Sequence, residues 1–317
     1  MSGGGGGASG AVSDIPSNTV PTENSAQIVK TEEKKDAAGN TAVVTTDSNG
    51  KQAAAVTVSA EAAKQAAAEN KPIALPGPEV KPVADTAKAT AIKVSFPEGT
   101  KKAEVSVPIK EATDTTVLMK VNEDGTMTLV PTSVVSEDGK GLVANLEAGN
   151  YVAVDNKVEF KDVKDGAWYE SGANFASSRG LMEGMGDGTF AQNAPLTKAQ
   201  TQAVIDRLGG VSKSESWNNA VAKFGKTEKC DRMTTLSMLY TACNANASAE
   251  AAKPSREVLA KYKDAASIPE AYVDVFCWAL EKNIIQGMGD GTLNPTGNLT
   301  RGQFGLLLER TVKAISL

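Results

Sequence analysis

The chain has 317 residues, a net charge of 33 − 38 = −5, and an aromatic content of only 5%. Its basic residues are spread out rather than clustered, which argues against nucleic acid or anionic lipid as the main partner. Histidine is absent, which excludes His-based acid–base catalysis, Ser-His-Asp and Cys-His nucleophiles, and histidine metal sites.

No apolar run approaches the roughly 18–20 residues needed to cross a membrane, so we expect no membrane insertion. The glycine-rich start of the chain lacks the apolar segment of a secretory signal, so we expect no export signal here. The three cysteines, Cys230, Cys243 and Cys277, form no CxxC pair and lie in apolar or helical contexts. They are predicted to be buried free thiols rather than a disulfide framework or a metal site.

Residues 1–40 are rich in Gly, Ser, Thr, Glu and Lys without periodicity, which predicts a disordered linker. Residues 41–157 predict a small β-rich, sandwich-like domain, because segments such as 91–96 and 103–109 alternate apolar and polar residues. Further strands are expected at 42–46, 53–58, 116–121, 127–130, 142–146 and 150–154, with a helix at 59–69 capped by Ser59. The acidic residues of this domain lie in turns, where backbone chemistry accounts for them. We therefore expect no catalytic residues and no enzyme.

From residue 158 onward the periodicity becomes helical, and one heptapeptide occurs twice. Gly184–Phe190 returns as Gly287–Leu293, at an offset of 287 − 184 = 103. The threonine of the following helix start has the same offset, 300 − 197 = 103, so this is a true internal repeat. Thr197 and Thr300 are predicted N-caps, and a glutamine three residues later completes each capping box.

Each loop places an aspartate between glycines that permit positive φ, Asp187 after Gly186 and Asp290 after Gly289. The aspartate is expected to accept hydrogen bonds from backbone N–H groups of its own loop. A rigid turn then delivers the chain to a helix start, twice.

Lys198 and Arg301 are predicted to lie in the first helical turn, where the helix dipole already makes the potential positive. A cation there is mildly unfavourable, by about 0.3–1 kcal/mol, so its loss is not expected to destabilise the fold. Because a basic residue occurs at this position in both copies, we favour anion binding at these helix starts over two solvated basic residues.

Residues 211–250 are predicted to hold a degenerate middle copy. Trp217 begins a segment similar to the first helix, and Asp231 and Arg232 take the cap and cation positions. The separation is 232 − 217 = 15, against 198 − 168 = 30 in the first copy, so the glycine loop is expected to be missing.

These residues resemble the S-layer homology (SLH) family. The first copy carries the resemblance in Phe160–Val163, Trp168-Tyr169, Gly184–Phe190 and Leu196–Gln200. The later copy carries it in Tyr262–Ala265, Gly287–Leu293, Asn294-Pro295 and Leu299–Gln303. The resemblance covers roughly residues 160–317, about half of the chain. It implies an α+β multidomain protein, in which a β-rich domain precedes an α-helical bundle of three pseudo-repeats at about 160–210, 211–250 and 262–317.

The resemblance implies non-covalent anchoring to a bacterial cell wall of the Gram-positive, clostridia-like type. The expected partner is an acidic, pyruvylated secondary cell-wall polysaccharide attached to peptidoglycan, and self-association in a surface layer is a further expectation. The expected location is extracellular, in the cell wall or S-layer. No metal and no cofactor are expected.

The expected glycan-binding residues are carried over from the family motifs, with the aromatic ring of Trp168 added because a residue at a helix start can be half exposed. They are Lys198, Arg301, Arg232, Asp187, Asp290, Gly186, Gly289, Thr197, Thr300 and Trp168. Arg301 is expected to matter most, Lys198 less because lysine offers only a point charge, and Arg232 least because its loop is missing. At most two grooves are expected to function.

Two alternatives come from other functional classes. A calcium-dependent docking or adhesion module is suggested by Gly-Asp-Gly-Thr, although each loop supplies a single aspartate where calcium needs several oxygen ligands. The other alternative is an enzyme in the β-rich domain that the SLH part merely carries.

Overall fold

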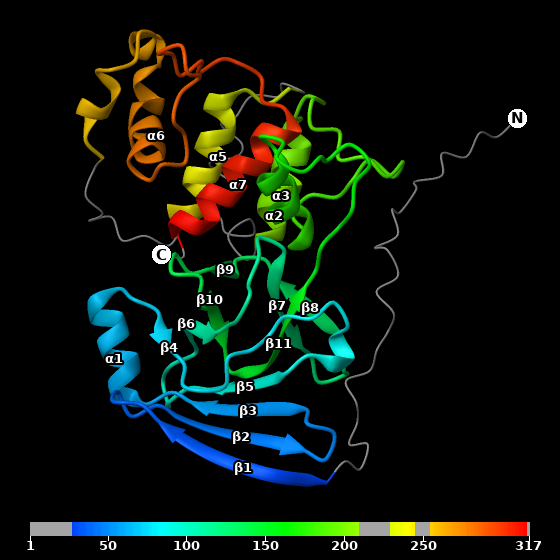
Figure 1. Cartoon of the computed structure of the whole chain (residues 1–317). Helices are drawn as coiled ribbons and strands as arrows, with labels where there is room; N and C mark the ends of the chain where they lie inside the picture. The colour runs from blue at the N-terminus through cyan, green and yellow to red at the C-terminus, as the bar shows by residue number, and fades with distance from the viewer. Residues whose placement is uncertain (1–26, 209–228, 245–253, 316–317) are drawn as a thin grey trace, which may run out of the picture.

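The computed structural model describes residues 27–208, 229–244 and 254–315, which form a β-rich part followed by a helical part (Figure 1). This is the α+β organisation that the sequence predicts. Among the described residues, no helix is both long and apolar enough to pass through a membrane.

The larger sheet has seven strands in the order β1-β2-β3-β5-β11-β7-β8. Their bounds are Ile28–Lys35 (β1), Thr41–Asp47 (β2), Gln52–Thr57 (β3), Ala91–Ser95 (β5), Thr116–Val121 (β7), Met127–Val130 (β8) and Gly149–Asp155 (β11). All neighbours are antiparallel except β3 and β5, which run parallel. The strands predicted at 42–46 and 53–58 pair as the hairpin β2–β3, and those predicted at 116–121 and 127–130 pair as the hairpin β7–β8.

A second sheet of four strands has the order β4-β6-β10-β9. The bounds are Ile73–Ala74 (β4), Lys102–Pro108 (β6), Val134–Val135 (β9) and Gly141–Glu147 (β10). Val56 of the first sheet and Val105 and Leu142 of the second belong to one buried cluster, so the sheets share a core. Helix α1, Ala60–Glu69, begins as predicted at Ser59, whose hydroxyl accepts from the N–H of Ala62 at 2.9 Å.

Strand β1 corrects the prediction that residues 1–40 form a disordered linker. Residues 1–26 lie outside the described part, but Ile28–Lys35 pairs antiparallel with β2. All eight residues of β1 are exposed, so the strand buries no side chain that would produce an alternating pattern. The strand is held by its backbone pairing with β2, and the composition of the segment gives no sign of this pairing.

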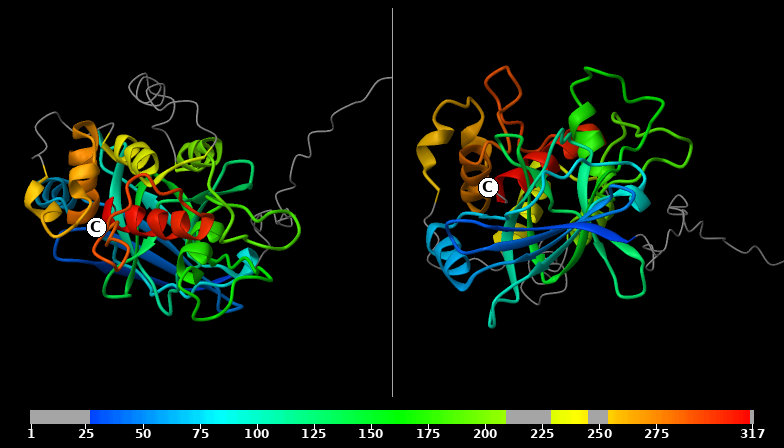
Figure 2. Two further views of the ribbon diagram at one scale, coloured as in Figure 1. Left: turned by 90° about the horizontal axis from the view of Figure 1, so that it is seen from above. Right: turned by 60° about the horizontal axis from the view of Figure 1, so that its bottom comes forward.

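The helical part contains α2 (Glu170–Ser178), α3 (Lys198–Arg207), α5 (Arg232–Asn244), α6 (Glu270–Glu281) and α7 (Arg301–Ile315). Single 3₁₀ turns at Arg256–Leu259 and Ala265–Ser267 precede α6. Helices α2 and α6 lie on opposite sides of α7 (Figure 2). The helix starts predicted after Thr197 and Thr300 are confirmed, because α3 begins at Lys198 and α7 at Arg301. The predicted segment from Trp217 lies outside the described residues.

The starts of α3, α5 and α7 bond to one another in a closed ring. The N–H of Leu196 donates to the carbonyl of Leu299 (2.8 Å), Leu299 to Cys230 (3.2 Å), and Cys230 back to Leu196 (3.0 Å). All three residues are buried, and each precedes a helix by two residues. Three segments, each leading into a helix, therefore meet inside the helical part.

Two glycines allow α2 and α7 to pack backbone against backbone. A Cβ atom placed on Gly172 would lie 2.4 Å from the backbone N of Leu306, and one on Gly305 would lie 2.9 Å from the carbonyl O of Gly172. Any side chain at either position would push the helices apart, so the pair fixes their contact.

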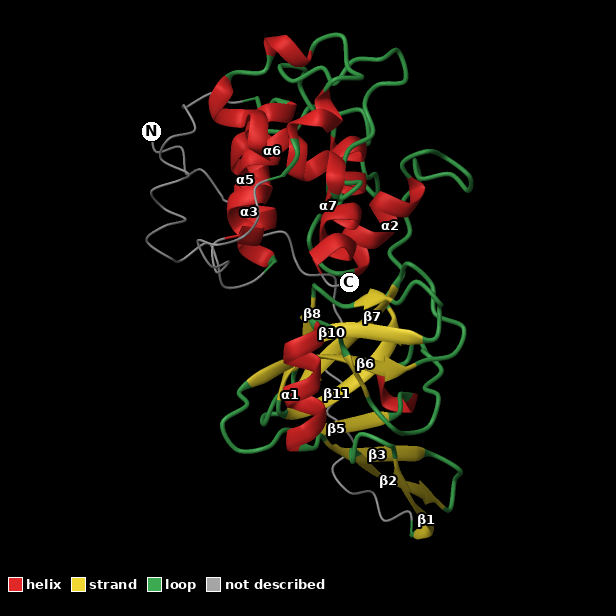
Figure 3. Cartoon of the chain, turned by 90° about the vertical axis from the view of Figure 1, so that its left-hand side faces the viewer, coloured by secondary structure: helices red, strands yellow, loops and turns green. Residues whose placement is uncertain are grey.

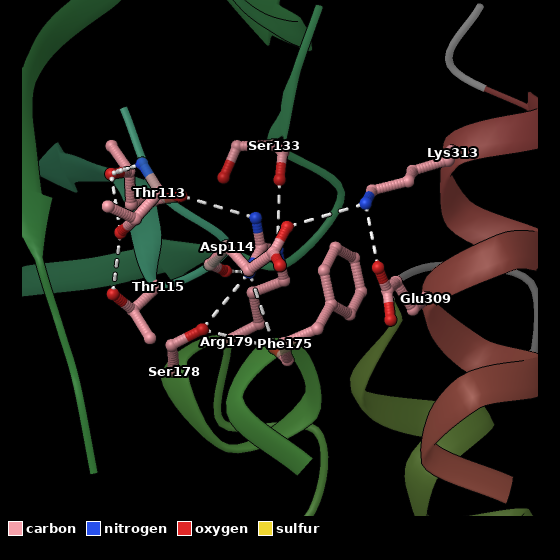
Figure 4. Close-up of polar contacts among 10 residues, drawn as sticks. Thr113, Asp114, Thr115, Ser133, Phe175, Ser178, Arg179, Glu309 and Lys313 are labelled. Carbon is pink, nitrogen blue, oxygen red and sulfur yellow. Dashed lines mark hydrogen bonds and ion pairs between the residues drawn. The ribbon is translucent and has the colours of Figure 1, made fainter. Parts of the chain in front are cut away.

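Arg179 joins the helical part to the β-rich part (Figure 4). Its side chain is 2% exposed and donates to the carbonyls of Ser133 (2.9 Å), Asp114 (2.7 Å) and Thr116 (3.2 Å) of the β-rich part. The guanidinium carbon also lies 3.7 Å from the ring centroid of Phe175. Burial lowers the pKa of Arg179 to about 9, so it remains charged at neutral pH.

A second contact crosses the same boundary from the end of α7. Lys313 Nζ lies 3.4 Å from the carboxylate of Asp114 and 2.7 Å from that of Glu309 (Figure 4). Val134 and Val143 of the smaller sheet also belong to the buried cluster of the helical part. The two parts thus share polar and apolar contacts, and each positions the other.

Candidate functional site

The aspartates of the two repeated loops make the same hydrogen bonds. Asp187 Oδ1 accepts from the backbone N–H (2.9 Å) and hydroxyl (2.6 Å) of Thr189. Asp290 Oδ1 accepts from Thr292 at the same distances. In both loops the hydroxyl hydrogen bond is the main cause that lowers the pKa of the aspartate. The prediction that these aspartates fold back onto their own loops is confirmed, and one oxygen of each is already engaged by the protein.

Asp162 and Asp264 close the two loops onto the segments that precede α2 and α6. The carboxylate of Asp162 accepts from the N–H groups of Phe190 (2.7 Å) and Ala191 (2.8 Å). Asp264 accepts in the same way from Leu293 and Asn294, both at 2.8 Å. No role was predicted for these two aspartates. The signal in the sequence is the Lys-Asp pair that occurs at the same place in both copies.

The lysine of each Lys-Asp pair completes the closure. Lys161 Nζ donates to the carbonyl of Asp187 (2.9 Å), and Lys263 Nζ donates to that of Asp290 (2.8 Å). Gly186 and Gly289 have φ of 82° and 83°, with nothing within 4 Å of an added Cβ atom. These two glycines therefore serve the turn, as the predicted positive φ requires.

Arg301 is a structural clamp between the two copies. It is 6% exposed, and its Nε donates to the carbonyl of Phe190 (2.8 Å) while Nη2 donates to that of Glu183 (2.5 Å). Its guanidinium carbon lies 5.0 Å from the centroid of the Phe190 ring. The side chain turns back toward the loop of the first copy and donates to two carbonyls there, so we now expect removal of Arg301 to destabilise the fold, in place of the neutral effect predicted from the helix dipole alone.

Arg232 at the start of α5 faces the loop of the last copy. Its side chain is 8% exposed, and Nη2 lies 3.0 Å from the sulfur of Met288. The Nε atom is buried without a hydrogen-bond partner among the described residues. Burial lowers the pKa of this guanidinium. Whether the middle copy has a glycine loop of its own lies outside the described residues, but the side chain of Arg232 meets the loop of the last copy.

A cleft of about 230 Å³ lies beside Arg232. Its polar lining includes Gln303 and Arg310 of α7, and its apolar lining includes Ile284 and Leu307. Two guanidinium groups thus border one cleft. Arg310 was not predicted, although it stands 103 residues after Arg207, at the offset of the repeat.

Arg207 shows what the equivalent arginine does in the first copy. Its Nη1 donates to the carbonyl of Leu181 and its Nη2 to the carboxylate of Glu183, both at 2.9 Å. Arg207 of the first copy and Arg301 of the last copy are therefore both engaged by backbone carbonyls at or beside the first loop. Arg232 and Arg310 are the two arginines that line the cleft at the other interface.

The remaining predicted residues lie at helix starts or on the surface. Thr197 and Thr300 are the caps of complete capping boxes, with glutamine Oε1 accepting from each threonine N–H at 3.0 Å. Lys198 is partly buried in the first turn of α3. Trp168 is 55% exposed and stacks edge-on against Tyr169 (5.3 Å), so its ring is open to solvent. The structure brings Arg232 to the cleft but not Trp168 or the two aspartates.

The cysteines and acidic groups form no metal-binding cluster within the described ranges. Cys230, Cys243 and Cys277 are unpaired, as predicted. Burial raises the pKa of the Cys243 thiol to about 12, which disfavours the reactive thiolate. No three Cys, Asp or Glu side chains gather there in a way that would hold a metal ion.

Comparison with known families identifies the two repeated units. The model of the S-layer homology domain matches residues 159–201 and 261–304. The matches contain both loops, both Lys-Asp pairs and the helix starts at Lys198 and Arg301. SLH domains anchor proteins to cell-wall polysaccharides and are typical of cell-surface, S-layer-associated proteins. No curated protein matches the chain.

Proposed function

We propose that this chain, which carries two SLH domains, attaches non-covalently to the cell wall by binding an acidic secondary polysaccharide, and that it catalyses no reaction. In our proposal the segment around α5 is a third, degenerate repeat, and the cleft beside Arg232 binds an anionic group such as a ketal-linked pyruvate. The ring of hydrogen bonds among Leu196, Cys230 and Leu299 supports three equivalent units.

One observation supports this location above the others: Arg232, whose buried Nε has no hydrogen-bond partner among the described residues, lines a cleft of about 230 Å³. The protein leaves the hydrogen-bonding capacity of this guanidinium partly unused, which costs free energy in the free protein, and a carboxylate in the cleft can bind the same group. Charge-assisted hydrogen bonds from a guanidinium to a carboxylate are among the stronger polar interactions in proteins. Arg310 supplies a second cation at the same cleft.

The test compares Arg232→Ala and Arg310→Ala with Arg256→Ala for retention on purified cell-wall sacculi. Arg256 is an exposed arginine of the helical part, paired with Glu270 and Asp274 outside the cleft, so it matches the change in charge. We expect about tenfold or greater loss of affinity for Arg232→Ala, a smaller loss for Arg310→Ala, and no change for Arg256→Ala.

Two treatments of the sacculi test which ligand the chain binds. Mild acid, which removes ketal-linked pyruvate, is expected to abolish retention of the unaltered chain. Retention that survives this treatment but is lost with EDTA would support the calcium alternative instead. Equal retention of all three variants and the parent chain would exclude the Arg232 cleft as the binding site.

A further inference from the structure

Among the described strands, none pairs with the outer edge of β1 in the larger sheet. Strand β1 spans eight residues, stands last in the strand order, and pairs on one side with β2. Every residue of β1 is exposed, whichever face of the sheet it points to. Figure 3 shows β1 at the end of the molecule farthest from the helices. Such an edge presents a row of backbone N–H and C=O groups with which another strand can pair.

The charges of β1 alternate in sign along one face of the strand. Lys30, Glu32 and Lys34 share this face because side chains alternate along a strand, and Thr31 and Glu33 point to the other. Lys30 Nζ lies 3.0 Å from Glu32 Oε1, so the face already carries an ion pair. Charged side chains protect an edge against arbitrary strands, but they also select the register in which a complementary strand can join.

We propose that β1 pairs antiparallel with β1 of a second copy of this chain, centred on Thr31. Two copies related by a two-fold axis perpendicular to the sheet place the central residue opposite itself. Centring on Lys30, Glu32, Glu33 or Lys34 places a charge opposite its own copy, which is unfavourable. Among these central positions, Thr31 alone avoids that clash.

The register centred on Thr31 also pairs opposite charges. It places Lys30 opposite Glu32 twice, because 30 and 32 are equidistant from the centre. Both residues lie in the part of β1 that follows the register shift between Ile28 and Lys30, where the strand pairs regularly with β2. The two seven-stranded sheets become one continuous sheet, with the helical parts at its two far ends. This inference does not depend on the proposed wall binding.

Cross-linking tests the register. Opposite residues in an antiparallel pair have Cα atoms about 4.5–5.5 Å apart, within the range that a disulfide spans. Thr31→Cys is therefore expected to give a disulfide-linked dimer under mild oxidation. Glu33→Cys is the matched control: Glu33 stands two residues from the centre of this register, so its two copies lie about 13 Å apart and cannot be bridged. Cross-linking of both variants alike, or of neither, would overturn the register.

Charge reversal tests the pairing itself by sedimentation velocity on the full chain. The parent chain is expected to dimerise in a concentration-dependent way. Lys30→Glu or Glu32→Lys places like charges opposite each other twice, and is expected to weaken the dimer about tenfold or more. The double variant Lys30→Glu/Glu32→Lys restores opposite charges and is expected to restore the dimer. A parent chain that stays monomeric, or single variants that dimerise like the parent, would overturn the proposal.

Discussion

Arg232 and Arg301 stand at the same position of two helices, yet their guanidinium groups have different partners. Arg301 donates to two carbonyls of the first loop and lies over the ring of Phe190. Arg232 reaches only the sulfur of Met288 and leaves Nε without a partner among the described residues. The residue equivalent to Phe190 in the last copy is Leu293, which has no aromatic face to attract a cation. One repeated motif thus yields a structural clamp at one interface and a candidate ligand site at the other.

The largest effect is expected when the clamp is removed. Arg301→Ala leaves two carbonyls without their donor and takes packing from Phe190, so the free energy of unfolding should fall by about 2–4 kcal/mol. Arg232→Ala removes a buried charge with an unsatisfied nitrogen, so its cost should stay within about 1 kcal/mol. Chemical denaturation of both variants measures the difference. Equal losses would show that the two arginines do the same structural work.

The closing aspartates are expected to have the next largest effect, equal in the two copies. Asp162→Ala and Asp264→Ala each leave two backbone N–H groups of a loop without an acceptor, which should cost about 2 kcal/mol. Hydrogen exchange of the loop amides, together with denaturation, checks this. A marked difference between the stability losses of the two variants would contradict this prediction, because the two loops would then not be equivalent in solution.

The sequence predicted those parts of the site that depend on neighbours along the chain. The Asp-Gly turns and the capping boxes at Thr197 and Thr300 need contacts only a few residues apart, and both are confirmed. The strands with a buried face were likewise predicted from their alternation. Strand β1 escaped prediction because it buries no side chain.

Contacts between distant segments could not be predicted in this way. Arg232 meets Met288, 56 residues later, only because the helix starts are arranged in a ring, and nothing local to residue 232 reveals that arrangement. Arg179 likewise meets its three carbonyl partners only because the helical part packs against the β-rich part. A single arginine in a sequence carries no sign of whether its partners are water or buried backbone.

Exchanging the aromatic residue tests the cause of the difference between the arginines. Phe190→Leu removes the ring beneath Arg301 and should cost about 1–2 kcal/mol of stability. Leu293→Phe offers Arg232 an aromatic face and is expected to weaken retention on sacculi severalfold while leaving Arg301 in place. Retention and thermal melting of the two variants measure both effects. If Leu293→Phe binds sacculi like the parent chain, the residue at this position does not control the guanidinium.

The smallest expected effect is on the stability of the chain at acidic pH, to which the two loops should contribute equally. Hydrogen bonds from Thr189 and Thr292 hold the pKa values of Asp187 and Asp290 below the ordinary 3.8. For a carboxyl whose pKa is lowered in the folded chain, the added stability is present above the unfolded value and is lost as the pH falls through the folded value. The melting temperature should therefore fall slightly more steeply below about pH 4 in the parent chain than in Asp187→Asn or Asp290→Asn. If the two variants differed in how their melting temperature depends on pH, the two loops would differ in their own stability. If the two variants behaved alike, the difference between the copies would lie in the contacts of Arg232 and Arg301 and not in the loops.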